Sequence, residues 1–329
     1  MTIGKSGDVA TPDLVDIICL LHKPDLAFFE RQIRSIQSQT SGRWRCHLHD
    51  DASGDTEAVE RMVAADDRIA LHLHRARLGV VGNAARAIGM LPRDSTIVFF
   101  ADQDDIWEPQ KIERFCQVFD ANPQWQLIHS DMALIDSQDN VTEASCFGFQ
   151  QRAVADVSPE SLLIRSIVTG CSMAVRFELL SRAMPLKTDA RPTVYHDRWI
   201  AMVAALDDAI GVLNEPLTRY RQHGANQLGA VSPADRGRQF RSAPMQRLKH
   251  AWAERLALLN ALEHWGRTSN LTPAARSRLD AILTWRSRYS PGLWRYGLRL
   301  QRRTWVDRRA ALGLAVGRFL VGPGEQDQV

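Results

Sequence analysis

Three carboxylates follow an apolar run in the segment TIVFFADQDDIW, residues 96–107: Asp102, Asp104 and Asp105. Crowded like charges repel and raise each other's pKa, so this pattern is typical of a site that holds a cation. In an extended chain, residues i and i+2 face the same way, which directs Asp102 and Asp104 to one point. Carboxylate oxygens are good ligands for Mg²⁺ or Mn²⁺. The alternative is a solvated acidic turn that caps a helix beginning near Pro109.

The acidic run must be positioned by strands and helices. The sequence before it alternates strand-like and helix-like segments. We expect strands over 15–21, 44–51, 68–74 and 96–100, with helices over 25–39, through Val59 and Met62, and over 79–91. Four such units in a row predict an α/β fold with a parallel sheet that helices cover on both faces. Ligands bind at the carboxyl ends of such strands. Asp50 and Asp51 fall at one of these ends, and the 102–105 run falls at another.

Composition is that of an ordinary globular protein. The chain has 329 residues, 45% hydrophobic and 24% charged, which is enough for one large domain or two moderate ones. Its five cysteines show neither close pairing nor metal-type spacing, so we expect no disulfide, no zinc and a reducing compartment. The apolar run at 15–21 is too short for a signal core or a membrane span, which predicts a cytoplasmic protein.

Charge is distributed unevenly along the chain. Residues 1–230 hold 23 Lys and Arg against 31 Asp and Glu, whereas residues 231–329 hold 18 against 7, so balances of −8 and +11 add to the net +3. Gly, Ser and Pro lie at the change, in GANQLGAVSPADRGR. We therefore predict two parts: an α/β domain over 1–229 and a helical, basic C-terminal region over 230–329.

Six motifs in series carry a family resemblance. HDDASGD (49–55) is similar to the DD-x-S-x-D motif of family 2 glycosyltransferases, and RLGVVGNAARAI (77–88) and ADQDDIWEPQKI (101–112) resemble its LG-x-x-x-N helix and D-x-DD-x-W-x-P-x-K segment. TGCSMAV (169–175), YHDRWIA (195–201) and YRQHGANQLG (220–229) resemble segments of its rhamnosyltransferase-like bacterial members. The resemblance implies a GT-A fold, Rossmann-like with a mostly parallel sheet, and inverting transfer from a nucleotide sugar. It favours dTDP-L-rhamnose as the donor, with UDP-sugars as the alternative.

The resemblance also implies roles for residues. Asp104 is the expected first ligand of Mg²⁺ or Mn²⁺, with Asp102 beside it and His223 as the third ligand; the cation bridges the donor diphosphate as a Lewis acid. His223 as an ordinary loop residue is the alternative. The implied donor-binding residues are Asp50, Asp51, Asn83, Asp102, Asp105 and Arg221, with Asp51 accepting from a pyrimidine N–H and Arg221 pairing with the diphosphate. The chain departs from the family at LLHKPD (20–25), where His22 stands in place of the usual stacking tyrosine, so the base stays open.

Asp197 is the expected general base, because inversion needs one carboxylate to deprotonate the acceptor hydroxyl. By pattern alone, Asp197 is equally suited to cap the helix whose apolar residues Trp199, Ile200 and Val203 follow it. The motif match favours the catalytic role. Gly170 and Cys171 are expected on the floor of the acceptor side, where a bare backbone leaves room for a sugar.

The basic C-terminal region interleaves tryptophans and tyrosines with arginines over 285–309. This pattern suits an anionic membrane surface, and we expect peripheral binding at the inner face of the cytoplasmic membrane, where a saccharide or lipid-linked saccharide acceptor is presented. The alternatives are that these helices cover the catalytic domain or form a homodimer contact.

Two other classes of function are compatible with parts of the sequence. A metal-dependent phosphohydrolase or nucleotidyltransferase also uses paired aspartates, but it needs no separate base after a TG-x-x-M strand. An adaptor that binds nucleic acid through its basic tail would show salt-sensitive binding to DNA or RNA. Both fit less well than a glycosyltransferase, and we expect no nucleic-acid partner.

Overall fold

Strands and helices alternate regularly in the first part of the chain. A computed structural model describes residues 14–151, 156–186, 193–223, 230–232, 234–235, 238, 242 and 244–286. Its first elements are β1 (Val15–Leu21), α1 (Leu26–Gln37), β2 (Trp44–Asp50), α2 (Glu57–Val63), β3 (Ile69–Leu73), α3 (Gly79–Gly89) and β4 (Ile97–Ala101). The expected alternation is confirmed. α1 begins where it does because the Asp25 carboxylate accepts from the N–H groups of Ala27 and Phe28.

The second part of the chain is less regular. It contains β5 (Ile106–Trp107), α4 (Lys111–Ala121), β6 (Leu127–Ile135), β7 (Val141–Glu143), α5 (Cys146–Phe149), α6 (Pro159–Ile164), η1 (Gly170–Ser172), β8 (Met173–Arg176), α7 (Phe177–Ala183), α8 (His196–Leu206), β9 (Ile210–Arg221), α10 (Pro244–Thr268), α11 (Pro273–Leu283) and η2 (Thr284–Arg286). The helix expected near Pro109 begins at Lys111. The acidic run therefore lies on the loop between β4 and the two-residue strand β5.

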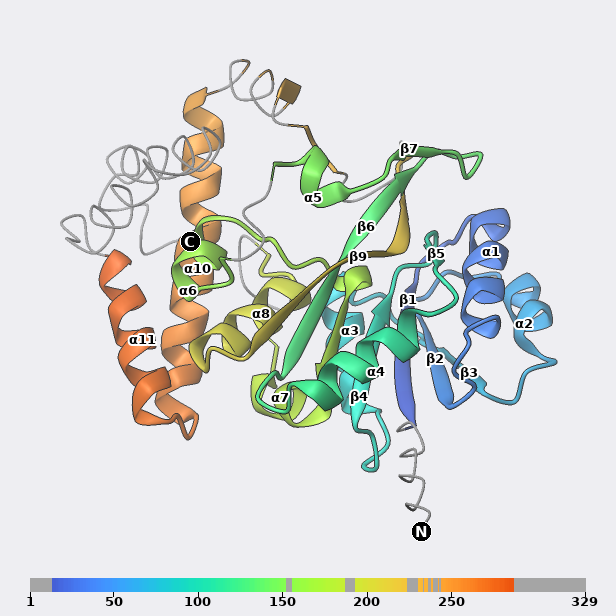
Figure 1. Cartoon of the computed structure of the whole chain (residues 1–329), viewed down its shortest axis with the longest axis horizontal. Helices are drawn as coiled ribbons and strands as arrows, with labels where there is room; N and C mark the ends of the chain where they lie inside the picture. Colours follow the sequence, from blue (N-terminus) through green and yellow to red (C-terminus); the bar gives the residue numbers. More distant parts are fainter. Residues whose placement is uncertain are drawn as a thin grey trace, which may run out of the picture.

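All of these strands join one mixed sheet in the order β3-β2-β1-β4-β8-β6-β9-β5, with β7 paired to β6 (Figure 1). β3, β2, β1 and β4 run parallel, as expected. β8 is antiparallel to both β4 and β6, and β9 is parallel to β6. In the parallel half, Leu21 pairs with Asp50 and Cys19 with Ala101, so both acidic segments leave the same edge of the sheet.

Helices cover both faces of the sheet. On β1 and β4, Ile17 and Phe99 point into a hydrophobic cluster with α1, α2 and α4. Their neighbours Ile18 and Phe100 point into a second cluster with α3, α6, α7 and α8. This alternation follows from the two-residue repeat of a strand, and it explains why all five residues of β4 are buried.

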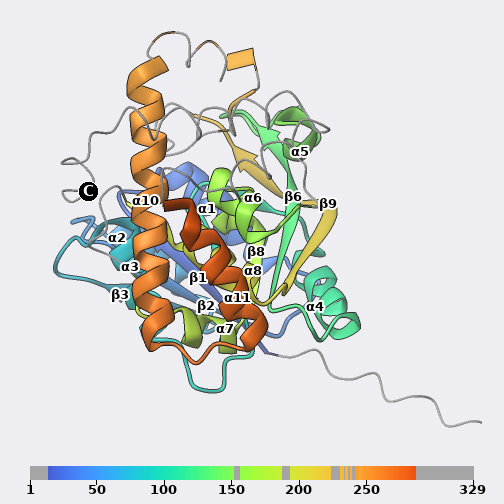
Figure 2. The same cartoon turned by 90° about the vertical axis from the view of Figure 1, so that its left-hand side faces the viewer.

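α10 and α11 lie side by side and pack on the second cluster (Figure 2). The Trp265 indole meets Trp199 of α8 edge to face, and its Nε1 donates to the Arg182 carbonyl over 2.9 Å. The buried Arg255 guanidinium donates to the Ile164 carbonyl, also over 2.9 Å. The helical region after residue 230 thus contributes to the core that covers the sheet. Within the described part of the chain, no helix combines the length and the apolar character that crossing a membrane requires.

Candidate active site

The acidic run gathers at the carboxyl end of β4. Oxygens of Asp102 and Asp105 and the sulfur of Cys171 lie within 4.8 Å of one another. Asp105 is fully buried and accepts from the Arg221 backbone N–H over 3.0 Å, yet burial and the charges of Asp102 and Asp104 raise its pKa well above the usual range. Asp102 keeps an exposed surface; nevertheless, desolvation of its carboxylate and the charges of Asp104 and Asp197 raise its pKa to about 7.

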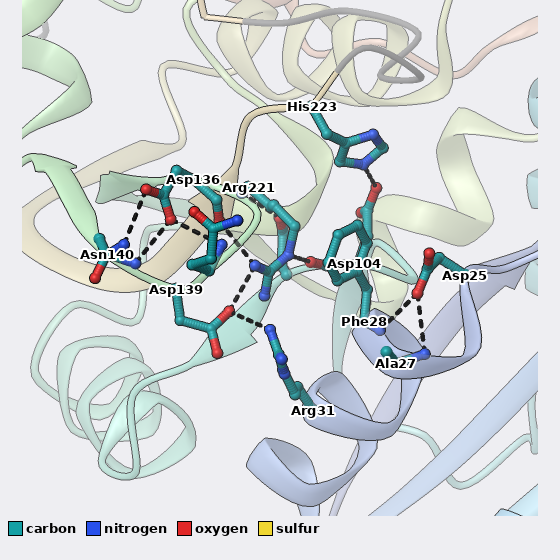
Figure 3. Close-up of polar contacts among 12 residues, drawn as sticks. Asp25, Ala27, Phe28, Arg31, Asp104, Asp136, Asp139, Asn140, Arg221 and His223 are labelled. Atoms are coloured by element: carbon teal, nitrogen blue, oxygen red, sulfur yellow. Dashed lines mark hydrogen bonds and ion pairs between the residues drawn. The ribbon is translucent and has the colours of Figure 1, made fainter.

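Asp104 and His223 form the second component of the cluster. His223 Nε2 lies 2.7 Å from Asp104 Oδ2, so residues 119 positions apart in the chain meet at one point (Figure 3). The His223 ring also packs against Phe28 of α1, with ring centroids 5.4 Å apart. The structure therefore brings two of the three residues that the sequence assigns to a cation, Asp104 and His223, into contact, while Asp102 groups with Asp105 and Cys171.

This donor set fits a divalent cation. Carboxylate and imidazole groups are ligands that Mn²⁺ accepts, and carboxylates suit Mg²⁺ as well. Desolvation first, and then the charges of Asp104 and Asp197, raise the pKa of Asp102, and a cation at this site would offset the repulsion. Asp102, Asp104 and His223 would hold the cation. Burial raises the pKa of the Cys171 thiol well above its ordinary value.

Asp197 faces the acidic cluster from the first turn of α8. Its Oδ2 accepts from the Gly170 N–H over 3.2 Å, and its Oδ1 accepts from the Arg198 N–H over 2.7 Å. The N-cap residue of α8 is Tyr195 and no side chain caps this helix, so Asp197 lies in the first turn without the capping contact of the alternative. The charge of Asp197 helps to raise the pKa of Asp102. A Cβ on Gly170 would lie 3.3 Å from His196 Nε2, so the small residue leaves the approach to Asp197 open.

The residues expected to bind the donor at β2 are largely engaged within the protein. Asp51 is buried, and its two oxygens accept from the N–H groups of Leu78 and Gly79 over 2.7 and 2.8 Å. Asp50 accepts from the Ser53 N–H over 2.9 Å. These carboxylates join β2 to its loop and to α3, and each oxygen retains a second lone pair for a ligand. Their contact with the base stays a prediction.

Asn83, also expected to bind the donor, lies beside the end of β2, and its donor contact stays a prediction. It is 1% exposed, and its Nδ2 donates to the His49 carbonyl over 2.8 Å. The side-chain amide of Asn83 therefore binds the backbone near the end of β2. His22, in place of the usual tyrosine, is half-buried, and its Nδ1 lies 3.1 Å from the Asp51 carbonyl oxygen.

Arg221 also lies differently from the prediction. Its side chain is fully buried, and its Nε donates to the Asp104 carbonyl over 2.7 Å while its Nη1 donates to the Asp136 carbonyl over 2.9 Å. Nη1 forms an ion pair with Asp139 as well, over 2.5 Å. A guanidinium held in this way supports the acidic loop and does not reach a diphosphate. Residues 224–229 of the same motif lie outside the described residues.

Lys111 is a site residue that the motif contains but to which we assigned no role. Its buried ammonium donates to the Cys171 carbonyl over 2.7 Å and to Thr218 Oγ1 over 2.8 Å, and it lies 3.8 Å from the centroid of the Trp107 ring. Burial lowers its pKa to about 7, although the nearby charges of Asp105 and Asp102 raise it. Lys111 thus joins α4, η1 and β9 behind the acidic cluster. The sequence signal that could have identified this residue was a lysine four positions after Trp107 in the motif.

Sequence comparisons identify a known domain in the first part of the chain. Residues 17–150 match the model of Glycosyl transferase family 2. An uncharacterized glycosyltransferase of Nostoc sp. is 27% identical over 208 residues, which are 60% of this chain and 62% of the relative. An uncharacterized glycosyltransferase of Haemophilus influenzae is 23% identical over 187 residues, which are 56% of this chain and 61% of the relative. Both matches span less than two thirds of the relatives' length.

Solved structures resemble almost the whole chain. TarS residues 1–349 of S. aureus, in complex with UDP-GlcNAc, superpose with a TM-score of 0.51 at 14% identity, covering 93% of this chain and 91% of that one. The mannosyltransferase PcManGT of Pyrobaculum calidifontis, in complex with GDP-Man and Mn²⁺, gives 0.51 at 18% identity, covering 98% and 86%. These likenesses show the fold: the chain has the GT-A architecture, with a mixed sheet between two layers of helices.

Proposed function

We propose that this chain is an inverting, metal-dependent glycosyltransferase that moves a sugar from a nucleoside-diphosphate sugar to a hydroxyl of a saccharide or lipid-linked saccharide. The observation that carries the proposal is the contact of Asp104 with His223 beside the Asp102–Asp105–Cys171 group that follows β4. Asp197 accepts from the N–H of Gly170, the residue before Cys171. A phosphohydrolase would use the acidic cluster but would have no task for Asp197. The family 2 domain and the uncharacterized glycosyltransferases among its relatives support the same reaction class.

The chain's own residues have separable tasks in this reaction. Asp197 accepts the proton of the acceptor hydroxyl as the sugar carbon is attacked, and the Gly170 N–H holds its carboxylate in place. Asp102, Asp104 and His223 would hold Mg²⁺ or Mn²⁺, which supplies Lewis acidity to the departing diphosphate. Lys111 and Arg221 hold the loops that carry these groups. Attack and departure on opposite faces of the sugar invert its anomeric configuration.

For the donor, we propose dTDP-L-rhamnose first and a UDP-sugar second. The resemblance of residues 169–223 to rhamnosyltransferase-like segments supports the first, and TarS, crystallised with UDP-GlcNAc, supports the second. PcManGT, in complex with GDP-Man, supports testing a donor with a purine base as well. A thermal-shift panel of dTDP-rhamnose, UDP-GlcNAc and GDP-mannose with Mn²⁺ separates them. The donor is the one whose addition raises the melting temperature most.

For the acceptor, we propose a lipid-linked saccharide of bacterial surface polysaccharide synthesis, reached at the inner face of the cytoplasmic membrane. The net charge of +11 over residues 231–329 supports this, because anionic lipids attract such a region. The aromatic and basic residues of 287–309 lie outside the described residues. A homodimer contact through this region is the competing proposal, which sedimentation of the purified chain distinguishes.

The test of the proposed function is Asp104→Asn. Because the amide cannot supply a negative oxygen, we expect Mn²⁺-dependent binding of UDP and dTDP, measured by calorimetry, to be lost while the circular dichroism spectrum is unchanged. Asp120→Asn, at an exposed position of α4, makes the same chemical change away from the cluster and should bind like wild type. Unchanged Mn²⁺-dependent binding by the Asp104→Asn chain would contradict the assignment.

The reaction class is tested separately, on the products. Incubation with the preferred donor, Mn²⁺ and an acceptor should give a glycoside whose anomeric proton, observed by NMR, shows the configuration opposite to that of the donor. Rapid release of free sugar without an acceptor, and no glycoside with one, would favour the phosphohydrolase alternative.

A further inference from the structure

The buried guanidinium of Arg221 connects three segments around Asp104 (Figure 3). From β9 it donates to the Asp104 carbonyl over 2.7 Å, which fixes the acidic loop. It also donates to the Asp136 carbonyl over 2.9 Å, at the turn between β6 and β7. Its Cζ lies 4.4 Å from the centroid of the Phe28 ring, on α1. The backbone N–H of Arg221 donates to Asp105 Oδ1 over 3.0 Å, so one residue holds both parts of the Asp104–Asp105 pair.

The turn over residues 136–140 carries the carboxylate that neutralises the charge of Arg221. Asp136 Oδ1 accepts from the N–H groups of Gln138 and Asn140 over 2.8 and 3.0 Å, which closes the turn. Asp139 adopts a left-handed conformation with φ of 68°, which aspartate tolerates better than most residues. In that conformation, its Oδ1 lies 2.5 Å from Arg221 Nη1 and 2.9 Å from Arg31 Nη1. The carboxylate therefore pairs with arginines from β9 and α1 together.

We propose that Arg221 and Asp139 are positioning residues for the cation site: they set where Asp104 and His223 stand, and so set the affinity for the divalent cation. Two observations link the ion pair to the ligands. Arg221 fixes the Asp104 main chain, and Phe28 contacts both the guanidinium and the His223 ring. A buried guanidinium without its carboxylate is strongly disfavoured, so loss of Asp139 would shift Arg221 and the Asp104 carbonyl with it. The inference rests on the cation role given to Asp104 and His223 in the proposed function.

The test uses Asp139→Asn in the full chain, which keeps the size of the side chain and removes its charge. Mn²⁺ is titrated in the presence of UDP, and free Mn²⁺ is measured by electron paramagnetic resonance well below the melting temperature. We expect the dissociation constant of Mn²⁺ to rise about tenfold, the ratio that corresponds to a displaced ligand worth about 1.4 kcal/mol. This reads cation binding directly, without turnover.

Arg34→Met is the matched control, because Arg34 lies on α1 like Arg31 but pairs with Glu30 at the surface. It should leave the Mn²⁺ affinity unchanged, since exposed pairs contribute little. Phe28→Leu removes the ring that contacts both Arg221 and His223 and touches no charge. It should also weaken Mn²⁺ binding, and it decides the matter if Asp139→Asn does not fold.

The outcomes separate this inference from the proposed function. Weaker Mn²⁺ binding in Asp139→Asn or Phe28→Leu, with Arg34→Met like wild type, supports it. Wild-type affinity in a folded Asp139→Asn chain, or in Phe28→Leu if Asp139→Asn is unfolded, overturns the positioning role and leaves the proposed function intact. Failure of the wild-type chain to bind Mn²⁺ with UDP overturns the cation role on which both rest.

Discussion

At the scale of single residues, Asp197 carries the sharpest prediction. Asp197→Asn keeps an oxygen that can accept from the Gly170 N–H but cannot take a proton from the acceptor. We expect donor affinity near wild type and a transfer rate lower by about 10² or more, the range for loss of a general base. Steady-state rates with the preferred donor, alongside calorimetry, measure the two quantities.

Retained turnover in the Asp197→Asn chain would reduce Asp197 to a helix cap. Glu215 would then be a poor substitute, because both of its oxygens are held by the Arg114 guanidinium over 2.6 and 3.0 Å. Asp189, the other carboxylate nearby in sequence, lies outside the described residues.

A row of histidines gives a second prediction, on pH. His49 is buried on β2 and stacks on His72 of β3 with centroids 4.5 Å apart, and its Nδ1 lies 3.1 Å from His74 Nε2. Burial, followed by the charges of its neighbours, lowers its pKa from 6.5 to about 3. The folded state thus binds fewer protons than the unfolded state between these values, and the free energy of unfolding falls as the pH drops through that window.

His49→Gln should remove part of this slope. Urea unfolding at several pH values between 6.5 and 3 measures it, and His250→Gln, at an exposed position of α10, is the control. Equal slopes for wild type and His49→Gln would mean that the imidazole is not held in its neutral form.

The residue scale also shows which parts of the site can be predicted from sequence. The contact of Asp104 with His223 was predictable because their motifs follow strands that end at one edge of the sheet, and the binding of a cation by Asp102, Asp104 and His223 stays a prediction. The setting of Arg221 was not predictable, because its counter-ion Asp139 lies 82 positions away and only the β6–β9 pairing brings the two together. The contact of Asn83 with the His49 carbonyl was not predictable for the same reason, because burial against β2 does not show in a local pattern.

At the scale of elements, a prediction follows from the close contact between Gly211 of β9 and Trp125, which lies just before β6. A Cβ on Gly211 would lie 2.2 Å from a ring carbon of Trp125, and an indole cannot move aside by a small rotation. Gly211→Ala should therefore lower the free energy of unfolding by about 1–3 kcal/mol, the usual cost of overpacking. Gly42→Ala, where the added Cβ meets nothing within 4 Å, is the control for urea denaturation. A Gly211→Ala chain as stable as wild type would show that Trp125 has room to move.

The first seven elements were predictable because each obeys a local rule. β4 is a continuous apolar run, β1 is one apart from Asp16, and α1 has apolar residues at spacings of three and four after a capping aspartate. The mixed half of the sheet was not predictable, since the direction of β8 and β6 is set by which strands they meet. β5 has two residues, which is too few for a periodic signal. The helix that follows it begins at Lys111 and not near Pro109.

At the scale of the whole molecule, the uneven charge leads to a prediction for the C-terminal region. If it docks on an anionic bilayer, each arginine near the surface contributes about 1 kcal/mol, which salt attenuates. The full chain should cosediment with anionic liposomes at low salt and be released as salt rises. Replacing Arg295, Arg299, Arg302 and Arg303 with Glu should abolish binding. These arginines lie outside the described residues.

Transfer to a soluble acceptor must be measured on the same charge-reversed chain, because α10 and α11 are part of the core that covers the sheet. If wild type ignores anionic liposomes, or if charge reversal also removes soluble-acceptor activity, the region is structural and the membrane proposal fails.

The sharing of β1 and β4 between two hydrophobic clusters has a consequence for local opening. Their backbone amides lie at the centre of the sheet and are covered by helices from both sides, so detaching either layer leaves them under the other. Exchange of these amides with deuterium therefore requires opening of the whole domain, and it should be the slowest in the chain, reporting the global free energy of unfolding. The start of α10, with exposed Met245, Arg247 and Lys249, should exchange through local fraying long before them.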